Sequence, residues 1–401
     1  MSLNTQPDLG AGPAAAGVPT TEELVDRAEA LVPTLRERAA DAETARRLPD
    51  ETLEDFHAAE FHKILQPRRF GGFGLGHDVA TEVVRTLAKG DGSSGWLANL
   101  VTTHGWQMAL FGAEAQEEVW GEDPAAFIAT GSFMTRSELT QVDGGYRLSG
   151  HWKFASGSDF ASWFMIMKPT PTSFDWLLVP RSEAEIVDDW FVSGLCATGS
   201  KDIILDDVFI PEHRVVKEAD ALAGRAPGAF LPDAVPNTNL PFIEVVAFGI
   251  PAAVIGMTQG LVDIFQQSMR KKRSAFTNQP QIERVANQLK LAEAKAATDA
   301  ATVIMRSRLQ DLRRWGQEGL PQDPAEVLTV RRDAAYVSQS MVQVATKISI
   351  AAGANGSYLK NPIQRFVRDI LVGGSHAIAS WEEIAEPYGR AAWGLDPMPA
   401  G

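Results

Sequence analysis

The stretch RFVRDILVGGSHAIASWEEIAEPYGRAAWG, residues 365–394, joins an Arg-Asp pair, a small-residue turn and a single histidine. His376 follows Asp369 of the pair by seven residues and comes directly after a Gly-Gly-Ser sequence. The apolar spacing predicts a late helix over about residues 361–385, with His376 on it. Imidazole titrates near neutral pH, so His376 is the leading candidate for general acid or base work.

The composition is that of an ordinary soluble globular protein. The 401 residues are 45% hydrophobic and 22% charged, and this length predicts two or three packed units. The formal net charge of -14 argues against a nucleic-acid partner. Pro251 and Asp263 interrupt the most apolar window, residues 245–265, which favours a buried core helix over a membrane span. Cys196 is the single cysteine, so a reducing cytoplasm fits best.

Periodicity divides the chain into helical and β segments. Thr20 and Glu23 form a capping box before a helical pattern. Short β-branched and aromatic runs with turn residues between them indicate an inserted β domain. Four long helical stretches then suggest an antiparallel bundle. The predicted α+β order is a flexible tail at 1–19, an N-terminal helical domain at 20–123, a middle β domain at 124–216, a connection at 217–240 and a C-terminal bundle at 241–401.

One strand could supply a wall for a flat aromatic ligand. On a strand through WKFASG, the side chains of Trp152, Phe154 and Ser156 point to the same face, and Ser132 precedes them in the chain. An ordinary half-buried sheet face explains the same pattern equally well. His104 is the second candidate for proton transfer, although a helical histidine is commonly a satisfied core residue.

Several common chemistries lack their sequence patterns. No pair among the seven histidines has the spacing of a zinc helix or knuckle, so no metal site is expected. The chain has no P-loop and no serine nucleophile elbow. The glycine-rich loop at residues 67–77 lacks the third glycine of the dinucleotide fingerprint, which favours an external source of any reduced cofactor.

Four segments together resemble the acyl-CoA dehydrogenase fold, and the resemblance runs from about residue 20 to residue 395. It implies an N-terminal helical domain, a middle β-barrel-like domain and a C-terminal four-helix bundle. The segments are PRRFGGFGLG (67–76), GLCATGSKDIILDDVFIPEHRV (194–215), RKKRSAF (270–276) and AGANGSYLKNPIQRFVRD (352–369).

One departure separates the chain from the dehydrogenases of this fold. Those enzymes commonly carry a catalytic glutamate eight residues after the Arg-Asp aspartate, and here that position is Ala377. The chain instead resembles the oxygenase component of two-component flavin-dependent monooxygenases, of the type that hydroxylates p-hydroxyphenylacetate or a steroid ring. The shared segments are SSGWLANLVTTHGW (93–106), WKFASG (152–157) and RDILVGGSH (368–376).

The resemblance implies roles for residues of this chain. His376 would be the general base toward a phenolic substrate, and His104 would orient that substrate. Ser132, which would also share in catalysis, and Ser156 would touch the flavin. Two further positions, Trp152 and Phe154, would lie near its isoalloxazine, and Arg273 from a neighbouring subunit would contact its phosphate-bearing tail.

The same resemblance implies cofactors and partners. Reduced FMN or FAD would come from a separate NAD(P)H-dependent flavin reductase and react with O2 to give a flavin C4a-hydroperoxide that hydroxylates an aromatic substrate. The protein would be a cytoplasmic homotetramer without nucleic-acid or membrane partners. N- or S-oxygenation on the same fold, an acyl-CoA dehydrogenase and a catalytically silent flavoprotein-like scaffold stay as alternatives.

Overall fold

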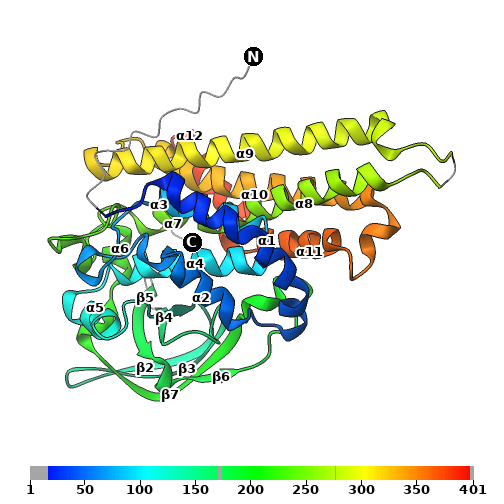
Figure 1. The fold of residues 1–401 in the computed structure, drawn as a ribbon. Helices are drawn as coiled ribbons and strands as arrows, with labels where there is room; N and C mark the ends of the chain where they lie inside the picture. Colours follow the sequence, from blue (N-terminus) through cyan, green and yellow to red (C-terminus); the bar gives the residue numbers. More distant parts are fainter. Residues whose placement is uncertain (1–16, 170–173, 276, 398–401) are drawn as a thin grey trace.

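The computed structural model describes residues 17–169, 174–275 and 277–397, so most of the expected N-terminal tail lies outside the described residues. Figure 1 shows the long C-terminal helices along one side of the molecule and the β-strands on the opposite side, with most of the N-terminal helices between them.

The N-terminal part of the chain is helical. Its helices are α1 (Thr21–Ala45), α2 (Asp50–Ala58), α3 (His77–Ala88), α4 (Gly92–Met108) and α5 (Ala113–Trp120). The predicted capping box begins α1, because Thr20 Oγ1 accepts a hydrogen bond from the Glu23 N–H at 3.2 Å and Glu23 Oε2 accepts one from the Thr20 N–H at 2.7 Å. Helix α5 was not predicted, since its eight residues are too few for a clear helical period.

The described residues of the middle part form two four-stranded sheets, which make up the expected barrel-like unit. One sheet has the order β1-β4-β5-β8 and the other the order β2-β3-β7-β6. β1 pairs with β4 in parallel, and the other pairs are antiparallel. The strands are β1 (Ile128–Gly131), β2 (Phe133–Val142), β3 (Gly145–Ala155), β4 (Trp163–Pro169), β5 (Phe174–Pro180), β6 (Glu185–Val187), β7 (Lys201–Pro211) and β8 (Val215–Val216).

Strand β2 has no clear signal in the sequence. Its residues are largely exposed, so it lacks the apolar alternation that marks a half-buried strand. Pairing with β3 nevertheless extends over almost its whole length, from Phe133 opposite Lys153 to Val142 opposite Gly145.

The C-terminal part of the chain forms the helical bundle. Its helices are α7 (Phe242–Val246), α8 (Gly249–Lys271), α9 (Val285–Glu318), α10 (Pro324–Ala352), α11 (Pro362–Gly374) and α12 (Trp381–Ala392). The apolar helix α8 is central, with α3, α4, α9, α10 and α11 packed against it. The segment Phe242–Lys271 contains a window with mean hydropathy 1.8 that is 89% buried, so protein packing accounts for its apolar character.

The stretch 217–240 contains α6 (Glu218–Leu222) and a short 3-10 helix. One prediction for this half of the chain is wrong. The late helix predicted over 361–385 is two helices, α11 and α12, and His376 lies in the break between them. The 3-10 helices are η1 (Phe61–Lys63), η2 (Arg68–Phe70), η3 (Arg181–Glu183), η4 (Cys196–Thr198), η5 (Glu212–Arg214), η6 (Pro227–Phe230), η7 (Gln281–Glu283), η8 (Ala354–Ser357) and η9 (Ala377–Ala379).

Candidate active site

Five aromatic rings from distant parts of the chain meet at one place, and we call them the aromatic cluster: Trp96, Phe133, Phe154, Trp190 and His376. The ring centroids of Phe133 and Phe154 lie 5.6 Å apart, and the Trp190 ring lies 6.1 Å from that of Phe154. The centroid of the His376 ring lies 6.3 Å from that of Phe133 and 5.7 Å from that of Trp96. Phe133 and Phe154 are 42% and 49% exposed, so the cluster offers open aromatic surface to a ligand.

A bulge in β3 places Phe154 in this cluster and corrects the predicted wall. The pairing register with β7 shifts between Trp152 and Ala155, and Phe154 has a left-handed backbone with φ 65°. Trp152 is fully buried instead, and its indole N–H donates to the Met167 carbonyl in the other sheet at 2.8 Å. Trp152 and Phe154 therefore do not share one face, because the bulge interrupts the alternation of the strand.

A chain of hydroxyl groups runs beside the aromatic cluster. Ser156 Oγ lies 2.6 Å from Ser200 Oγ, which lies 2.7 Å from Thr198 Oγ1. At one end Trp96 donates its indole N–H to Ser156 Oγ at 3.3 Å, and at the other Thr198 donates to the Leu195 carbonyl at 2.8 Å. We call Ser156, Ser200 and Thr198 the hydroxyl relay. Sequence analysis singled out Ser156 alone, although the other two lie in the quoted segment 194–215.

The position of His376 follows from a local hydrogen bond. Its Nδ1 accepts from the N–H of Ile378 at 3.2 Å, so the side chain caps the short helix η9. Burial lowers the pKa of the His376 ring to about 4, so the ring is neutral at pH 7. Because Nδ1 accepts, the single proton of the neutral ring is on Nε2, which makes that atom a hydrogen-bond donor.

His104 on α4 has the opposite arrangement. Its Nδ1 lies 2.6 Å from the Ile128 carbonyl, which can only accept, so Nδ1 carries the proton. Burial lowers the pKa of the His104 ring to about 4, and the hydrogen bond to Ile128 opposes this effect only in part. Nε2 is therefore an acceptor, and the Thr130 hydroxyl lies 3.4 Å from it.

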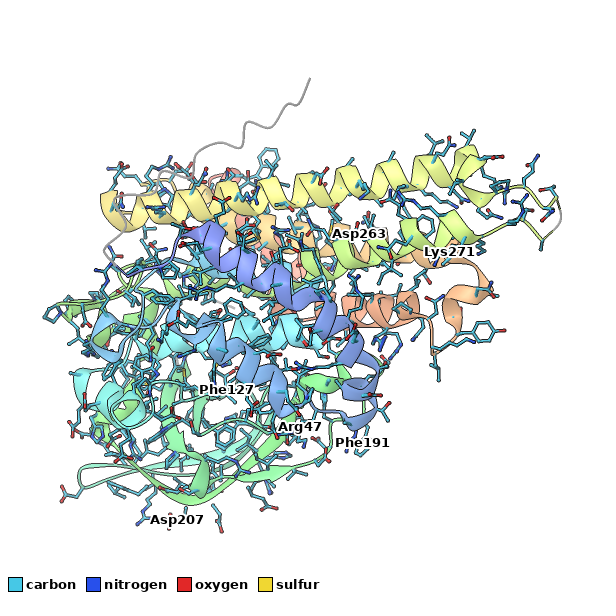
Figure 2. All side chains as sticks on the ribbon, in the orientation of Figure 1. Arg47, Phe127, Phe191, Asp207, Asp263 and Lys271 are labelled. Atoms are coloured by element: carbon cyan, nitrogen blue, oxygen red, sulfur yellow. The ribbon has the colours of Figure 1, made fainter. Side chains whose placement is uncertain are left out.

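The two remaining predicted site residues, Ser132 and Arg273, lie in different parts of the structure. Ser132 is half-buried between β1 and β2 and is the neighbour of Phe133 in the aromatic cluster. Arg273 follows α8 and donates from Nε to the Asn278 carbonyl at 2.8 Å within the α8–α9 connection. Figure 2 shows Lys271, two residues earlier, far from the sheets, so this chain does not bring its own Arg273 to the aromatic cluster.

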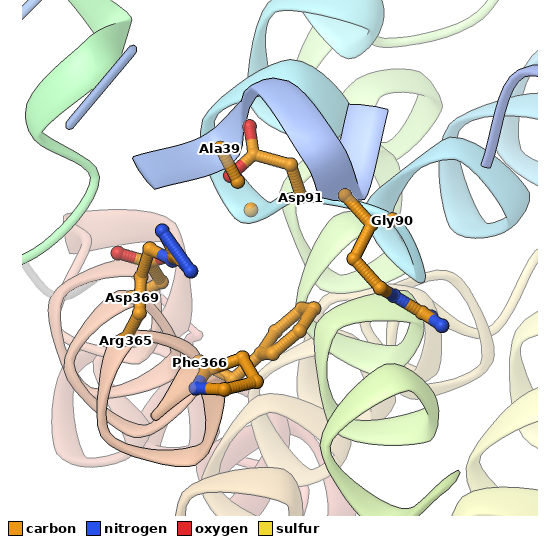
Figure 3. A pocket seen from close by; sticks show the side chains of 9 residues that line it. Ala39, Gly90, Asp91, Arg365, Phe366 and Asp369 are labelled. Carbon is orange, nitrogen blue, oxygen red and sulfur yellow. The ribbon is translucent and has the colours of Figure 1, made fainter. Parts of the chain in front are cut away.

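The Arg-Asp pair of α11 holds the loop that precedes η4. Asp369 Oδ1 accepts from the Leu195 N–H at 2.6 Å, and Arg368 donates to the Ser193 carbonyl. A small cavity lies beside Asp369, with Asp91 on one side and Arg365 of α11 on the other (Figure 3). None of the aromatic cluster residues lines this cavity.

Asp369 shares its buried surroundings with a second carboxyl group, that of Asp91. Burial, with the nearby charge of Asp91 as the second cause, raises the pKa of Asp369 to about 7. Burial also raises the pKa of Asp91. The two carboxyls do not readily carry a charge at the same time, because like charges in a buried site repel each other.

Family models match most of the described helices. The model described as "Acyl-CoA dehydrogenase, N-terminal domain" matches residues 19–126, and the one described as "Acyl-CoA dehydrogenase, C-terminal domain" matches residues 248–381. The curated protein "Flavin-dependent monooxygenase, oxygenase subunit HsaA" of Mycobacterium tuberculosis (strain CDC 1551 / Oshkosh) is 34% identical, over 92% of this chain and 94% of that protein. The chain belongs to the flavin-dependent monooxygenases of the acyl-CoA dehydrogenase fold.

Two further proteins place this oxygenase in the same family. The "FADH(2)-dependent resorcinol hydroxylase, oxygenase component" of Rhizobium sp. (strain MTP-10005) is 32% identical, over 97% of this chain and 98% of that protein. The crystal structure of "3-HSA hydroxylase" from Rhodococcus sp. RHA1 has a TM-score of 0.88 and 32% identity, and covers 94% of this chain and 98% of that one. The fold and the family that the sequence resemblance implied are confirmed.

The residues of the aromatic cluster suit the cofactor that these relatives use. An isoalloxazine ring is flat and aromatic, and the exposed rings of Phe133 and Phe154 offer it matching surface. The half-buried Ser156 beside them supplies a polar atom for the edge of such a ring.

Proposed function

We propose that this oxygenase component hydroxylates a small phenolic compound with O2 and reduced FMN or FAD. In the overall reaction one oxygen atom enters the aromatic ring, the other leaves as water, and reduced flavin becomes oxidised flavin. The observation that supports this most directly is that His376 meets the exposed ring of Phe133 and the buried indole of Trp96, which donates to the hydroxyl of Ser156. The names of the relatives support the same reaction class.

The cofactor site in this proposal lies at the aromatic cluster. Phe133 and Phe154 would pack on the flavin ring, and Ser156 and Ser132 would contact its polar edge. When bound, reduced flavin supplies the electrons that activate O2. The residues around it would keep water away, since aromatic side chains line the cluster.

The two histidines would divide the handling of the substrate hydroxyl. Their tautomers favour His104 Nε2 as the acceptor and His376 Nε2–H as the donor to the substrate oxygen. Donation to that oxygen stabilises negative charge on it, which makes the ring carbon more reactive toward an electrophilic oxygen. In this proposal His376 is a hydrogen-bond donor, whereas the family resemblance implied a general base.

The proposed assembly is a cytoplasmic homotetramer that receives flavin from a separate NAD(P)H-dependent reductase. Support for self-association comes from apolar side chains that are exposed on the C-terminal helices and their connections. Examples are Val303 at 64%, Ile350 at 73%, Leu359 at 83% and Trp393 at 85%. In such an assembly Arg273 would reach a neighbour's flavin, because it lies at the far end of α8.

The test mixes purified protein with reduced FMN or FAD and a panel of phenols without oxygen, and then adds ¹⁸O2. The expected product gains one labelled oxygen atom, and the His376→Ala variant loses at least about a hundredfold in rate. His213→Ala is the matched control, because that histidine pairs with Glu118 at 3.0 Å away from the aromatic cluster. Oxidised flavin that forms at the protein-free rate, without labelled product, would contradict the proposal. Bleaching of bound oxidised flavin by acyl-CoA would favour the dehydrogenase alternative.

A further inference from the structure

The hydroxyl relay has a fixed direction, because both of its ends are fixed. The Leu195 carbonyl can only accept, so Thr198 must donate its one hydroxyl proton to it, across 2.8 Å. Thr198 then has only lone pairs left for Ser200, at 2.7 Å, and Ser200 must donate. By the same reasoning Ser156 must donate to Ser200, across 2.6 Å.

The opposite end of the relay agrees with this direction. The Trp96 indole N–H can only donate, and it points at Ser156 Oγ across 3.3 Å. Ser156 therefore donates its proton to Ser200 and accepts the Trp96 N–H with one lone pair. A single lone pair stays free, so toward the aromatic cluster Ser156 can accept a hydrogen bond but cannot donate one.

The protein holds this arrangement firmly. Thr198 and Ser200 are 1% and 4% exposed, so water cannot readily replace either partner. Leu195 has a left-handed backbone with φ 52°, and the Asp369 carboxylate accepts its N–H at 2.6 Å. The Leu195 carbonyl also accepts from the Trp190 indole at 3.2 Å, so the relay ends on a fixed group.

We propose that Thr198 and Ser200 are positioning residues that keep Ser156 an acceptor, and that the site thereby prefers reduced over oxidised flavin. This inference rests on the proposed function, in which Ser156 meets the polar edge of the flavin. With N5 of that edge beside Ser156, the contact depends on the redox state, because reduced flavin carries an N–H at N5, whereas oxidised flavin has a lone pair there. Ser156, which can only accept, can bind the N5–H of reduced flavin. Toward oxidised flavin it presents a lone pair to a lone pair, which is repulsive.

Such a preference fits an enzyme that takes reduced flavin from another protein. The oxygenase would capture the reduced form, and the oxidised form would leave after the reaction without a hydrogen bond from Ser156. The direction of one buried hydroxyl chain would thus set the direction of flavin exchange.

Thr198 offers a matched pair of variants. Thr198→Val keeps the side-chain shape but has no hydroxyl, so Ser200 turns its proton toward Ser156, and Ser156 becomes free to donate into the site. Thr198→Ser keeps the hydroxyl and the direction of the relay. Ser200→Ala breaks the relay at a second point and also frees the Ser156 proton. Thermal unfolding checks that each variant is folded.

The measurement is the ratio of two dissociation constants, one for oxidised flavin in air and one for reduced flavin under anaerobic conditions. FMN and FAD are both titrated by fluorescence and ultrafiltration. For whichever of these two cofactors binds more tightly, the dissociation constant of the oxidised state is divided by that of the reduced state. We expect wild type and Thr198→Ser to prefer reduced flavin, and the ratio to fall by about tenfold in Thr198→Val and Ser200→Ala.

Two outcomes would overturn the inference while leaving the proposed function intact. One is an equal ratio in Thr198→Val and Thr198→Ser. The other is a uniform loss of affinity for both flavin forms, which would show a purely structural role. If wild type bound neither form and made no labelled product, the proposed function itself would fail, and the inference would fail with it.

Discussion

The Leu195 N–H donates a hydrogen bond of 2.6 Å to the carboxylate of Asp369, although the two residues lie 174 positions apart in the chain. Leu195 is also the residue whose carbonyl ends the hydroxyl relay. The Arg-Asp pair of α11 is therefore linked to the hydroxyl relay, and through Trp190 to the aromatic cluster, by one loop.

Asp369 is expected to make stability decline as the pH rises through neutrality. Its pKa is raised from 3.8 to about 7, so the folded protein holds a proton that the unfolded chain releases. The resulting stabilisation is complete below about pH 4 and is lost as the pH rises through about 7. Between pH 5 and pH 7 wild type should lose about 2 kcal/mol relative to Asp369→Asn, which cannot ionise.

Urea unfolding of both proteins across pH 5–8 measures this difference. Asp263→Asn is the control, because its side chain is 48% exposed and its removal tests the simple loss of one carboxyl group. A constant difference between wild type and Asp369→Asn over this pH range would show that Asp369 does not titrate there.

Two substitutions of His376 separate hydrogen-bond donation from proton abstraction. The amide of His376→Asn can still cap Ile378 in the way that Nδ1 does, but it does not reach as far as Nε2. His376→Gln can place an N–H where Nε2–H stood. If His376 donates, we expect His376→Asn to lose about a hundredfold or more in hydroxylation rate and His376→Gln to retain clearly more. Equal losses, with unchanged melting temperatures, would instead indicate a general base.

The left-handed conformation of Phe154 is expected to lower the stability of the protein, while the Phe154 ring contributes to flavin binding. Its φ of 65° is strained for any residue with a Cβ atom, by about 1 kcal/mol. Phe154→Ala and Phe154→Gly both remove the ring, but only glycine relieves the strain. We expect Phe154→Gly to be more stable than Phe154→Ala by about 1 kcal/mol, while both bind flavin about tenfold more weakly. Equal stabilities in thermal unfolding would exclude strain at this position.

The bulge at Phe154 also shows where sequence reasoning fails. Alternation along WKFASG placed Trp152 on the same face as Phe154 and Ser156, and the bulge makes this placement of Trp152 wrong. A left-handed phenylalanine is rare and has no sequence signal, and the bulge is set by pairing with β7, more than forty residues later. The fold could be predicted because capping boxes, hydrophobic periods and family segments are local in sequence.

The tautomers of the two histidines could not be predicted from the sequence for a related reason. Their ring type identified His104 and His376 as proton-transfer candidates, but each tautomer depends on a backbone partner, Ile128 or Ile378. The break between α11 and α12 was hidden as well, because the cap from His376 onto η9 is a side-chain contact within an otherwise helical apolar pattern. Thr198 and Ser200 carried no signal beyond their place in a family segment.

Glu82 is expected to be the most costly ionic residue to remove among those that join the N-terminal helices to the bundle. Its carboxylate, 5% exposed, accepts from Arg85 at 2.7 Å on α3 and from Arg306 at 2.6 Å on α9. Burial raises the pKa of Glu82, but the hydrogen bonds and charges of the two arginines outweigh burial and hold the pKa below 4.5.

We expect Glu82→Ala to lower the free energy of unfolding by about 3 kcal/mol at pH 7, because it leaves buried Arg85 without its carboxylate partner. Glu293→Ala breaks an exposed pair with Lys347 and should cost less than about 1 kcal/mol. Urea unfolding at pH 7 measures both values, and similar losses in the two variants would show that the Glu82 cluster contributes no more than a surface ion pair.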